Sequence, residues 1–316
     1  MKTWLIISGI FTLSILLLFA SYFQIDEGQP TWVYQLQDAS IEKIAPLPVD
    51  YAVIDPTKNG SDPYSKKDIT ILQDKGIRPI AYISIGEASS YHSYWEAGWG
   101  TTHKGVLEVT DSAPEWVGKI ANPEWPESVK VRYWNPEWQQ NVIEELNKIQ
   151  DVGFSGVYLD IIDAYEYWGN PETYTEGGEA AVPFDPKSED EAAERMISFV
   201  RMLSAVAKER DPGFMIIPQN GEGLLEFDNG LYLNAVDGIG VEDIWFNGSI
   251  KNDENVIEQR LKWLAQFKKA NKPVFSVDYV EGRYTINRYY RLCRNEKFYC
   301  FAADPDRSLS SIKAFD

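Results

Sequence analysis

Short apolar segments recur along the chain from residue 32 onward, and each is bounded by Gly, Pro, Asn or Asp. Their apolar residues follow one another almost without interruption instead of alternating with polar ones. That pattern is typical of strands that are buried on both faces, as in parallel sheets. It predicts eight strands, at residues 32–37, 51–56, 77–86, 156–162, 214–220, 238–244, 272–279 and 297–304.

Amphipathic segments with helical spacing separate several of these strands. The clearest covers residues 136–152, where Asn135 precedes the segment as an N-cap and Pro136 occupies the first turn. The same spacing occurs over residues 190–210 and 253–270, whereas residues 38–50 are not clearly helical.

Strands that alternate with helices predict a single (β/α)₈ barrel over residues 24–316. Long βα loops are expected after the third and fourth strands. An open doubly wound sheet is the alternative, but such a sheet normally carries a Gly-rich first turn, which the sequence lacks.

The N-terminal segment differs from the rest of the chain. Lys2 is followed by a nearly continuous apolar run from Trp4 to Phe23, which is typical of a secretory signal peptide and is also long enough to span a bilayer. Cleavage as a signal peptide and retention as a membrane anchor therefore both stay open for residues 1–23. Either case predicts a secreted or extracytoplasmic protein that touches a membrane only through residues 4–23, if they are not removed.

The charge of the chain restricts its partners. Beyond residue 23 there are 29 basic and 48 acidic residues, a formal charge of −19. A surface this acidic repels nucleic acid and attracts cations. With only two His and two Cys, we expect no metal site and no cofactor. Cys293 and Cys300 either form a disulfide loop or remain thiols. We expect the chain to act as a monomer.

Acidic and amide side chains stand where the predicted strands end. Active sites of (β/α)₈ barrels lie at this end of the strands. A strand-end Asp can equally be an ordinary helix cap, but a whole ring of carboxylates is electrostatically costly unless it binds cations, donors or a moving proton. The ring consists of Asp55, Glu87, Asp160, Asp163, Gln219, Asn220, Glu242, Asp243, Asp278 and Asp304.

Paired carboxylates without His or metal ligands favour glycoside hydrolysis, in which one acid protonates the leaving oxygen and the other attacks the sugar or activates water. The segments GVYLDIID and GIGVEDIWF place Asp160 and Glu242 at strand ends behind apolar residues. Six of the eleven Trp lie between residues 95 and 138. They either stack on sugar rings or attach the long loop to the barrel.

From residue 31 to the C-terminus, the sequence resembles the endo-α-1,4-polygalactosaminidase-like barrels of glycoside hydrolase family 114. The resemblance rests on eight segments in this order: WVYQLQ, YAVIDP, IAYISIGEA, YWNPEWQ, GFSGVYLDIIDAY, IIPQNGE, GIGVEDIWF and VFSVDYV. The resemblance implies Asp160 and Glu242 as the catalytic pair. It also implies a set of sugar-binding residues, namely Asp55, Tyr82, Glu87, Gln219, Asn220, Trp245, Asp278 and Tyr279.

The resemblance further implies a substrate that contains α-1,4-linked galactosamine, a cationic amino-sugar polysaccharide that suits the acidic charge. By analogy with other barrels, a retaining mechanism is expected, with Asp160 as the nucleophile and Glu242 as the general acid/base. Two alternatives remain: a non-catalytic carbohydrate-binding or adhesion protein on the same barrel, and a hydrolase of a different amino-sugar polymer.

Overall fold

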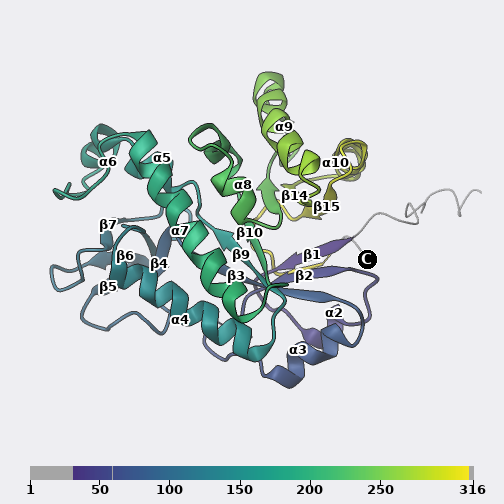
Figure 1. The fold of residues 1–316 in the computed structure, drawn as a ribbon, viewed down its shortest axis with the longest axis horizontal. Helices are drawn as coiled ribbons and strands as arrows, with labels where there is room; N and C mark the ends of the chain where they lie inside the picture. The colour runs from purple at the N-terminus through teal and green to yellow at the C-terminus, as the bar shows by residue number, and fades with distance from the viewer. Residues whose placement is uncertain (1–30, 59, 313–316) are drawn as a thin grey trace, which may run out of the picture. The chain divides into compact units, whose positions relative to one another are not determined.

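The computed structural model of the protein describes residues 31–58 and 60–312. Eight parallel strands form its centre, and each coincides with a predicted segment but is shorter by a few residues (Figure 1). The strands are β1 (Trp32–Gln35), β2 (Tyr51–Ile54), β3 (Arg78–Ser84), β9 (Gly156–Asp160), β10 (Met215–Pro218), β11 (Ile239–Glu242), β14 (Val274–Tyr279) and β15 (Tyr299–Ala303).

The strands follow one another in chain order, as in a (β/α)₈ barrel. Five are hydrogen-bonded in the order β1-β2-β3-β9-β10, and three in the order β11-β14-β15. A parallel bridge between Gln219 and Gly240 joins the two groups. At the remaining seam, the indole Nε1 of Trp32 donates a 2.9 Å hydrogen bond to the carbonyl of Tyr299. The predicted fold class is therefore confirmed.

Aromatic rings fill the interior of the barrel. Trp32 lies 5.3 to 6.2 Å, between ring centroids, from four other inward-facing rings: Tyr34, Tyr158, Phe275 and Phe301. A glycine is required at position 240, because a Cβ there would lie 1.8 Å from the hydroxyl of Tyr158. Packed rings below the C-terminal ends of the strands provide a rigid floor for any site built there.

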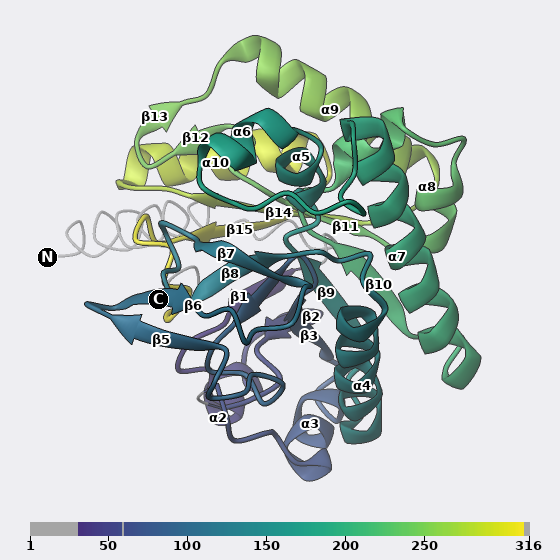
Figure 2. The ribbon, with the colours of Figure 1, turned by 90° about the vertical axis from the view of Figure 1, so that its left-hand side faces the viewer.

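Helices lie outside the strands (Figure 2). The three segments with the clearest periodicity form α4 (Pro136–Val152), α7 (Glu189–Arg210) and α9 (Glu254–Lys269), each begun by a side-chain cap. Residues 38–50 contain only the single turn α2 (Ile41–Ile44). The remaining helices of the outer layer are α3 (Lys66–Gln73), η1 (Glu222–Glu226), α8 (Leu231–Ala235) and α10 (Arg283–Asn295).

The long segment after β3 is not the irregular loop that the sequence suggests. It folds into β4 (Glu87–Ser89), β5 (Gly100–His103), β6 (Val106–Val109), β7 (Val117–Ala121) and β8 (Ser128–Val131), which pair as an antiparallel sheet β4-β8-β7 and a hairpin β5-β6. Its Trp rings pack on each other and on α4: Trp99 contacts Trp116, which contacts Trp138 at 5.0 Å between centroids. Trp116 and Trp138 are fully buried, so these two attach the insertion to the barrel.

The segment after β9 is also ordered. It contains α5 (Ala164–Trp168) and α6 (Pro171–Glu176). Buried Arg132 joins this segment to the preceding insertion: its Nε donates to Asp185 at 2.7 Å, its Nη2 donates to the carbonyl of Ala180 at 2.8 Å, and its guanidinium lies over the Trp168 ring. The two insertions therefore form one connected structure beside the barrel mouth. A short hairpin, β12 (Phe246–Asn247) and β13 (Ile250–Lys251), follows β11.

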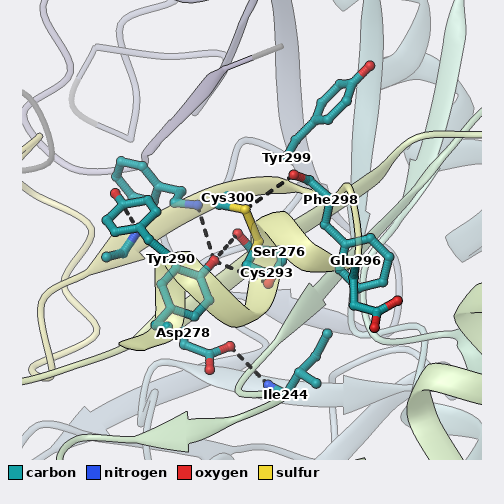
Figure 3. Close-up of a disulfide and its surroundings, with 12 residues drawn as sticks. Ile244, Ser276, Asp278, Tyr290, Cys293, Glu296, Phe298, Tyr299 and Cys300 are labelled. Atoms are coloured by element: carbon teal, nitrogen blue, oxygen red, sulfur yellow. Dashed lines mark hydrogen bonds between the residues drawn. A yellow bond between two sulfur atoms is a disulfide. The ribbon is translucent and has the colours of Figure 1, made fainter. Parts of the chain in front are cut away.

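Cys293 and Cys300 form a disulfide that links the end of α10 to β15 (Figure 3). The sequence left open whether these cysteines form a disulfide or remain thiols, and the structure has the disulfide. The predicted signal peptide or anchor, residues 1–23, lies outside the described residues. Across residues 31–58 and 60–312, none of the helices combines the length and apolarity that crossing a bilayer requires.

Candidate active site

Most of the residues predicted for the site lie at the C-terminal ends of the barrel strands. Asp160 is the last residue of β9 and Glu242 the last of β11, and Tyr279 ends β14. Gln219 and Asn220 directly follow β10. Because parallel strands end on the same side of a barrel, these five residues, which come from four separate parts of the sequence, surround one mouth.

Asp160 accepts hydrogen bonds on both carboxylate oxygens. Tyr82 donates its hydroxyl to Oδ2 at 2.5 Å, and Gln219 donates Nε2 to Oδ1 at 3.1 Å. The orientation of the Gln219 amide is fixed by Tyr34, whose hydroxyl donates to its Oε1 at 3.1 Å. Ile161, directly after Asp160, has a φ of 58°, so the chain bends sharply where the strand ends.

Glu242 has an equivalent pair of donors. Tyr279 donates its hydroxyl to Oε1 at 2.5 Å, and Asn220 donates Nδ2 to Oε2 at 2.8 Å. The Tyr279 ring is covered by the guanidinium of Arg307 at 4.2 Å, which is ion-paired with Asp243. Each carboxylate is therefore held by one tyrosine and one amide, and among the described residues neither forms an ion pair.

Both carboxyl groups are electrostatically perturbed. Burial and the negative charge of Glu242 raise the pKa of Asp160 to about 7, against the opposing effect of the Tyr82 hydrogen bond. Burial likewise raises the pKa of Glu242, and the hydrogen bonds from Tyr279 and Asn220 oppose it. Since the charge of one carboxylate disfavours ionisation of the other, the pair holds a proton to higher pH than two isolated carboxyl groups would. One acid and one base are what a two-carboxylate glycosidase needs.

Two further predicted residues, Asp55 and Glu87, have local partners. Asp55 follows β2 and accepts hydrogen bonds from the backbone N–H and the hydroxyl of Thr57. Glu87 begins β4 and is buried against Lys130, with 2.5 Å between Nζ and Oε1, and it also accepts a hydrogen bond from Asn122. The charge of Glu87 is thus neutralised within the protein.

Asp278 and Trp245, which were expected to contact the sugar, are buried and have partners within the protein. Asp278 has no exposed surface, and its carboxylate accepts the backbone N–H groups of Ile244, Trp245 and Phe246 at 2.8 to 2.9 Å. Figure 3 shows the hydrogen bond from Ile244. Trp245 is 3% exposed, and its ring packs against Tyr289 and Phe298. Asp278 therefore holds the loop after β11 from inside, and the Trp245 ring packs beneath the same loop.

Asp163 belongs to the ring of acidic residues, and its negative charge helps to raise the pKa of Asp160. It immediately precedes α5, and its side chain does not cap the helix. Burial raises its pKa, and the positive charge of Lys130 opposes this.

Sequence reasoning missed several residues that support the site. Lys130 comes from a strand of the insertion that was expected to be irregular. Arg260 on α9 donates hydrogen bonds to the carbonyl of Glu242 and to Asn220. Tyr34 donates a hydrogen bond to Gln219, and Arg307 lies over the ring of Tyr279. Only Tyr34 had a signal, since it lies in a predicted strand; the others occupy positions that no local pattern distinguishes from surface charges.

The same fold occurs in two solved structures that are only distantly related in sequence. The glycoside hydrolase domain of PelA from Pseudomonas aeruginosa is 15% identical, with a TM-score of 0.60 over 90% of this chain and 98% of the domain. Ega3 from Aspergillus fumigatus, solved as a complex with galactosamine, is 17% identical, with a TM-score of 0.63 over 88% of this chain and 92% of that one. At this identity the likeness shows the fold.

Sequence relatives are closer. An uncharacterized protein of Thermotoga maritima is 35% identical over 294 residues, which are 90% of this chain and 84% of the relative. An uncharacterized protein of Methanocaldococcus jannaschii is 41% identical over 295 residues, 90% of this chain and 78% of the relative. The sequence model of glycoside-hydrolase family GH114 matches residues 20–309. The protein whose barrel ends in this carboxylate pair is thus a glycoside hydrolase, and it belongs to family GH114.

Proposed function

We propose that the protein cleaves internal α-1,4 linkages of a galactosamine-containing polysaccharide, with Asp160 as the nucleophile and Glu242 as the general acid/base. The observation that carries this proposal is the matched environment of the two carboxylates. Each is buried at a strand end, each is held by a tyrosine and an amide, and each has a raised pKa.

In the division of roles that we propose, Asp160 acts in its ionised form and Glu242 carries the proton. Asp160 accepts hydrogen bonds from Tyr82, Gln219 and the backbone N–H of Ile161, and these stabilise its ionised form. When Glu242 carries the shared proton, the charge that raises the pKa of Asp160 is removed. The form with ionised Asp160 and protonated Glu242 is ready for attack on the anomeric carbon and protonation of the leaving oxygen.

Retention of configuration is part of the proposal. A nucleophilic Asp160 forms a glycosyl-enzyme intermediate, and Glu242 then removes a proton from the water that hydrolyses it. Proton NMR of the first product resolves the anomers before they equilibrate. An α-anomer as the first product supports retention, and a β-anomer contradicts it.

The charge of the protein supports an amino-sugar substrate. Galactosamine carries an ammonium group when it is not acetylated, and the chain has a formal charge of −18 over its full length. The galactosamine bound to Ega3, a protein of the same fold, adds support by analogy.

The test is a reducing-end assay of the full-length protein on a partially deacetylated α-1,4-galactosamine polymer. Wild type is compared with Asp160→Asn and Glu242→Gln, with circular dichroism as the control for folding. We expect folded variants that lose at least about a thousandfold in rate. Binding of the polymer without new reducing ends would favour the non-catalytic alternative, and cleavage of a glucosamine polymer alone would favour a different amino-sugar substrate.

We also propose that the enzyme acts outside the cytoplasm. A polysaccharide cannot cross a bilayer, so enzyme and polymer have to meet on the same side. The disulfide between Cys293 and Cys300 supports export, because disulfides persist in oxidising compartments. Mass spectrometry of the N-terminal peptide from the native source, together with membrane fractionation, distinguishes a cleaved signal peptide from a retained anchor.

A further inference from the structure

The amide that holds Glu242 is itself held by an ion pair from the outer helix layer. Arg260 on α9 forms a salt bridge with Glu222 in η1, with 2.5 Å between Nε and Oε1. Its Nη1 donates to the backbone carbonyl of Glu242 at 2.6 Å, and its Nη2 donates to Oδ1 of Asn220 at 3.3 Å. Glu222 is 3% exposed, so this ion pair is well shielded from water.

These contacts determine which way the Asn220 amide points. Its Oδ1 faces two donors, the backbone N–H of Glu242 at 3.0 Å and the guanidinium of Arg260. A flipped amide would bring its NH₂ group against both donors and would lose both hydrogen bonds. The NH₂ group is therefore directed at Oε2 of Glu242, to which it donates at 2.8 Å.

The backbone at this point needs the same support. Asn220 has a φ of 57°, and Asp243, directly after Glu242, has a φ of 47°. Such left-handed conformations are costly for residues other than glycine and persist only where their surroundings fix them. Arg260 contacts the carbonyl between Glu242 and Asp243 and the side chain of Asn220, so it restrains both sites at once.

We propose that Arg260 is a positioning residue for the carboxyl group of Glu242, and that it acts through the amide of Asn220. This inference rests on the proposed role of Glu242 as general acid/base. Arg260 donates to Glu222, Asn220 and a backbone carbonyl, and none of these contacts uses the carboxyl oxygens of Glu242. Its planar guanidinium supplies three donors in fixed directions, which a lysine cannot reproduce.

Other titratable or charged groups that act on Glu242 remain in place when Arg260 is changed. They come from β3, β9, β14 and the segments after β11 and β15, and they are Tyr82, Tyr158, Asp160, Asp243, Tyr279 and Arg307. A change in the protonation of Glu242 in an Arg260 variant is therefore assignable to the loss of Arg260, that is, to its contact with Asn220, to its positive charge and to the unpaired carboxylate of Glu222.

The experiment uses the full-length protein with Arg260→Met and Arg260→Lys. Lys262→Met is the matched control, because Lys262 is an exposed cation on the same helix. We expect Arg260→Met to lower kcat about ten- to a hundredfold with little change in KM, since the general acid is misplaced while sugar contacts remain. Arg260→Lys should recover part of the loss, and Lys262→Met should match wild type.

A double-mutant cycle tests the path through Asn220. If Arg260 acts through this amide, Arg260→Met should have little further effect on kcat in an Asn220→Ala background. Full additivity of the two losses would overturn the proposal. So would an Arg260→Met variant with wild-type kcat.

A readout that does not need activity is the carboxyl ¹³C titration of Glu242, assigned with Glu242→Gln. Its midpoint should move to higher pH in Arg260→Met, because the Asn220 amide is no longer held against Oε2 and a positive charge that favours the ionised form is lost. A lower melting temperature with an unchanged midpoint would show a purely structural role and would overturn the proposal. If wild type cleaves no polymer, the proposed function fails, yet the titration still decides the role of Arg260.

Discussion

The two tyrosines that hold the carboxylates should each affect a different limb of the pH profile. Tyr279 donates to Glu242 and Tyr82 donates to Asp160, each at 2.5 Å between oxygens. Replacement by phenylalanine removes one donor from one carboxylate and leaves the ring in place. The changes Tyr279→Phe and Tyr82→Phe are therefore matched controls for each other.

The magnitude follows from the type of hydrogen bond. A hydrogen bond to a charged group is worth about 1.5–3 kcal/mol, and its loss disfavours the ionised form. At about 1.4 kcal/mol per pH unit, the protonation equilibrium moves to higher pH by roughly one to two pH units. In Tyr279→Phe, Glu242 as the proposed general acid stays protonated to higher pH, so the alkaline limb of kcat/KM should move to higher pH. In Tyr82→Phe, Asp160 as the proposed nucleophile needs a higher pH to ionise, so the acidic limb should move to higher pH.

The assay is reducing-end release across pH 4 to 10 at substrate concentrations well below KM, which reports the ionisations of the free enzyme. Circular dichroism at both ends of the range confirms that the variants remain folded. If both variants move the same limb, or if Tyr279→Phe moves the acidic one, the roles of Asp160 and Glu242 are assigned wrongly.

Three further outcomes concern stability. Asp160 has a pKa of about 7 in the folded protein against 3.8 as its ordinary value; the folded state therefore binds more protons between these pH values and loses stability as the pH rises through them. Asp160→Asn should thus raise the free energy of unfolding at pH 8 by roughly 1–3 kcal/mol, which raises the melting temperature, and it should have little effect at pH 4. A gain of equal size at pH 4 would contradict this. Replacing Cys293 and Cys300 by Ser should cost about 2 kcal/mol in urea unfolding, whereas an unchanged midpoint would show that the disulfide adds nothing. Arg132→Met leaves the carboxylate of Asp185 buried without its cation and should lower the free energy of unfolding by about 3–5 kcal/mol. Residues 163–187 should also be cleaved faster by a protease. Resistance to proteolysis equal to that of wild type would refute the link between the insertions.

The sequence predicted the barrel because its signals are local. Strands buried on both faces consist of continuous apolar residues, and a helix such as α4 carries its own cap and its own periodicity. Asp160 and Glu242 could be found for the same reason, since each is the last residue of an apolar strand.

The insertions and the environment of the site could not be predicted in this way. The strands after β3 are short and partly exposed, so their pattern has too few positions to indicate pairing. Asp278 and Asp160 both lie at strand ends and look equivalent in sequence. In the structure, backbone N–H groups donate to Asp278, whereas the side chains of Tyr82 and Gln219 donate to Asp160.

The sequence by itself determined the fold class, the family and the two carboxylates, because these depend on residue type and on spacing along the chain. Tertiary structure alone decided which acids are available to a substrate and which are neutralised within the protein, as Glu87 is by Lys130. It also decided that a helix residue, Arg260, orients the amide beside Glu242. The physical reason is that the charge and orientation of a buried side chain depend on partners brought together from distant parts of the chain, which spacing in the sequence does not record.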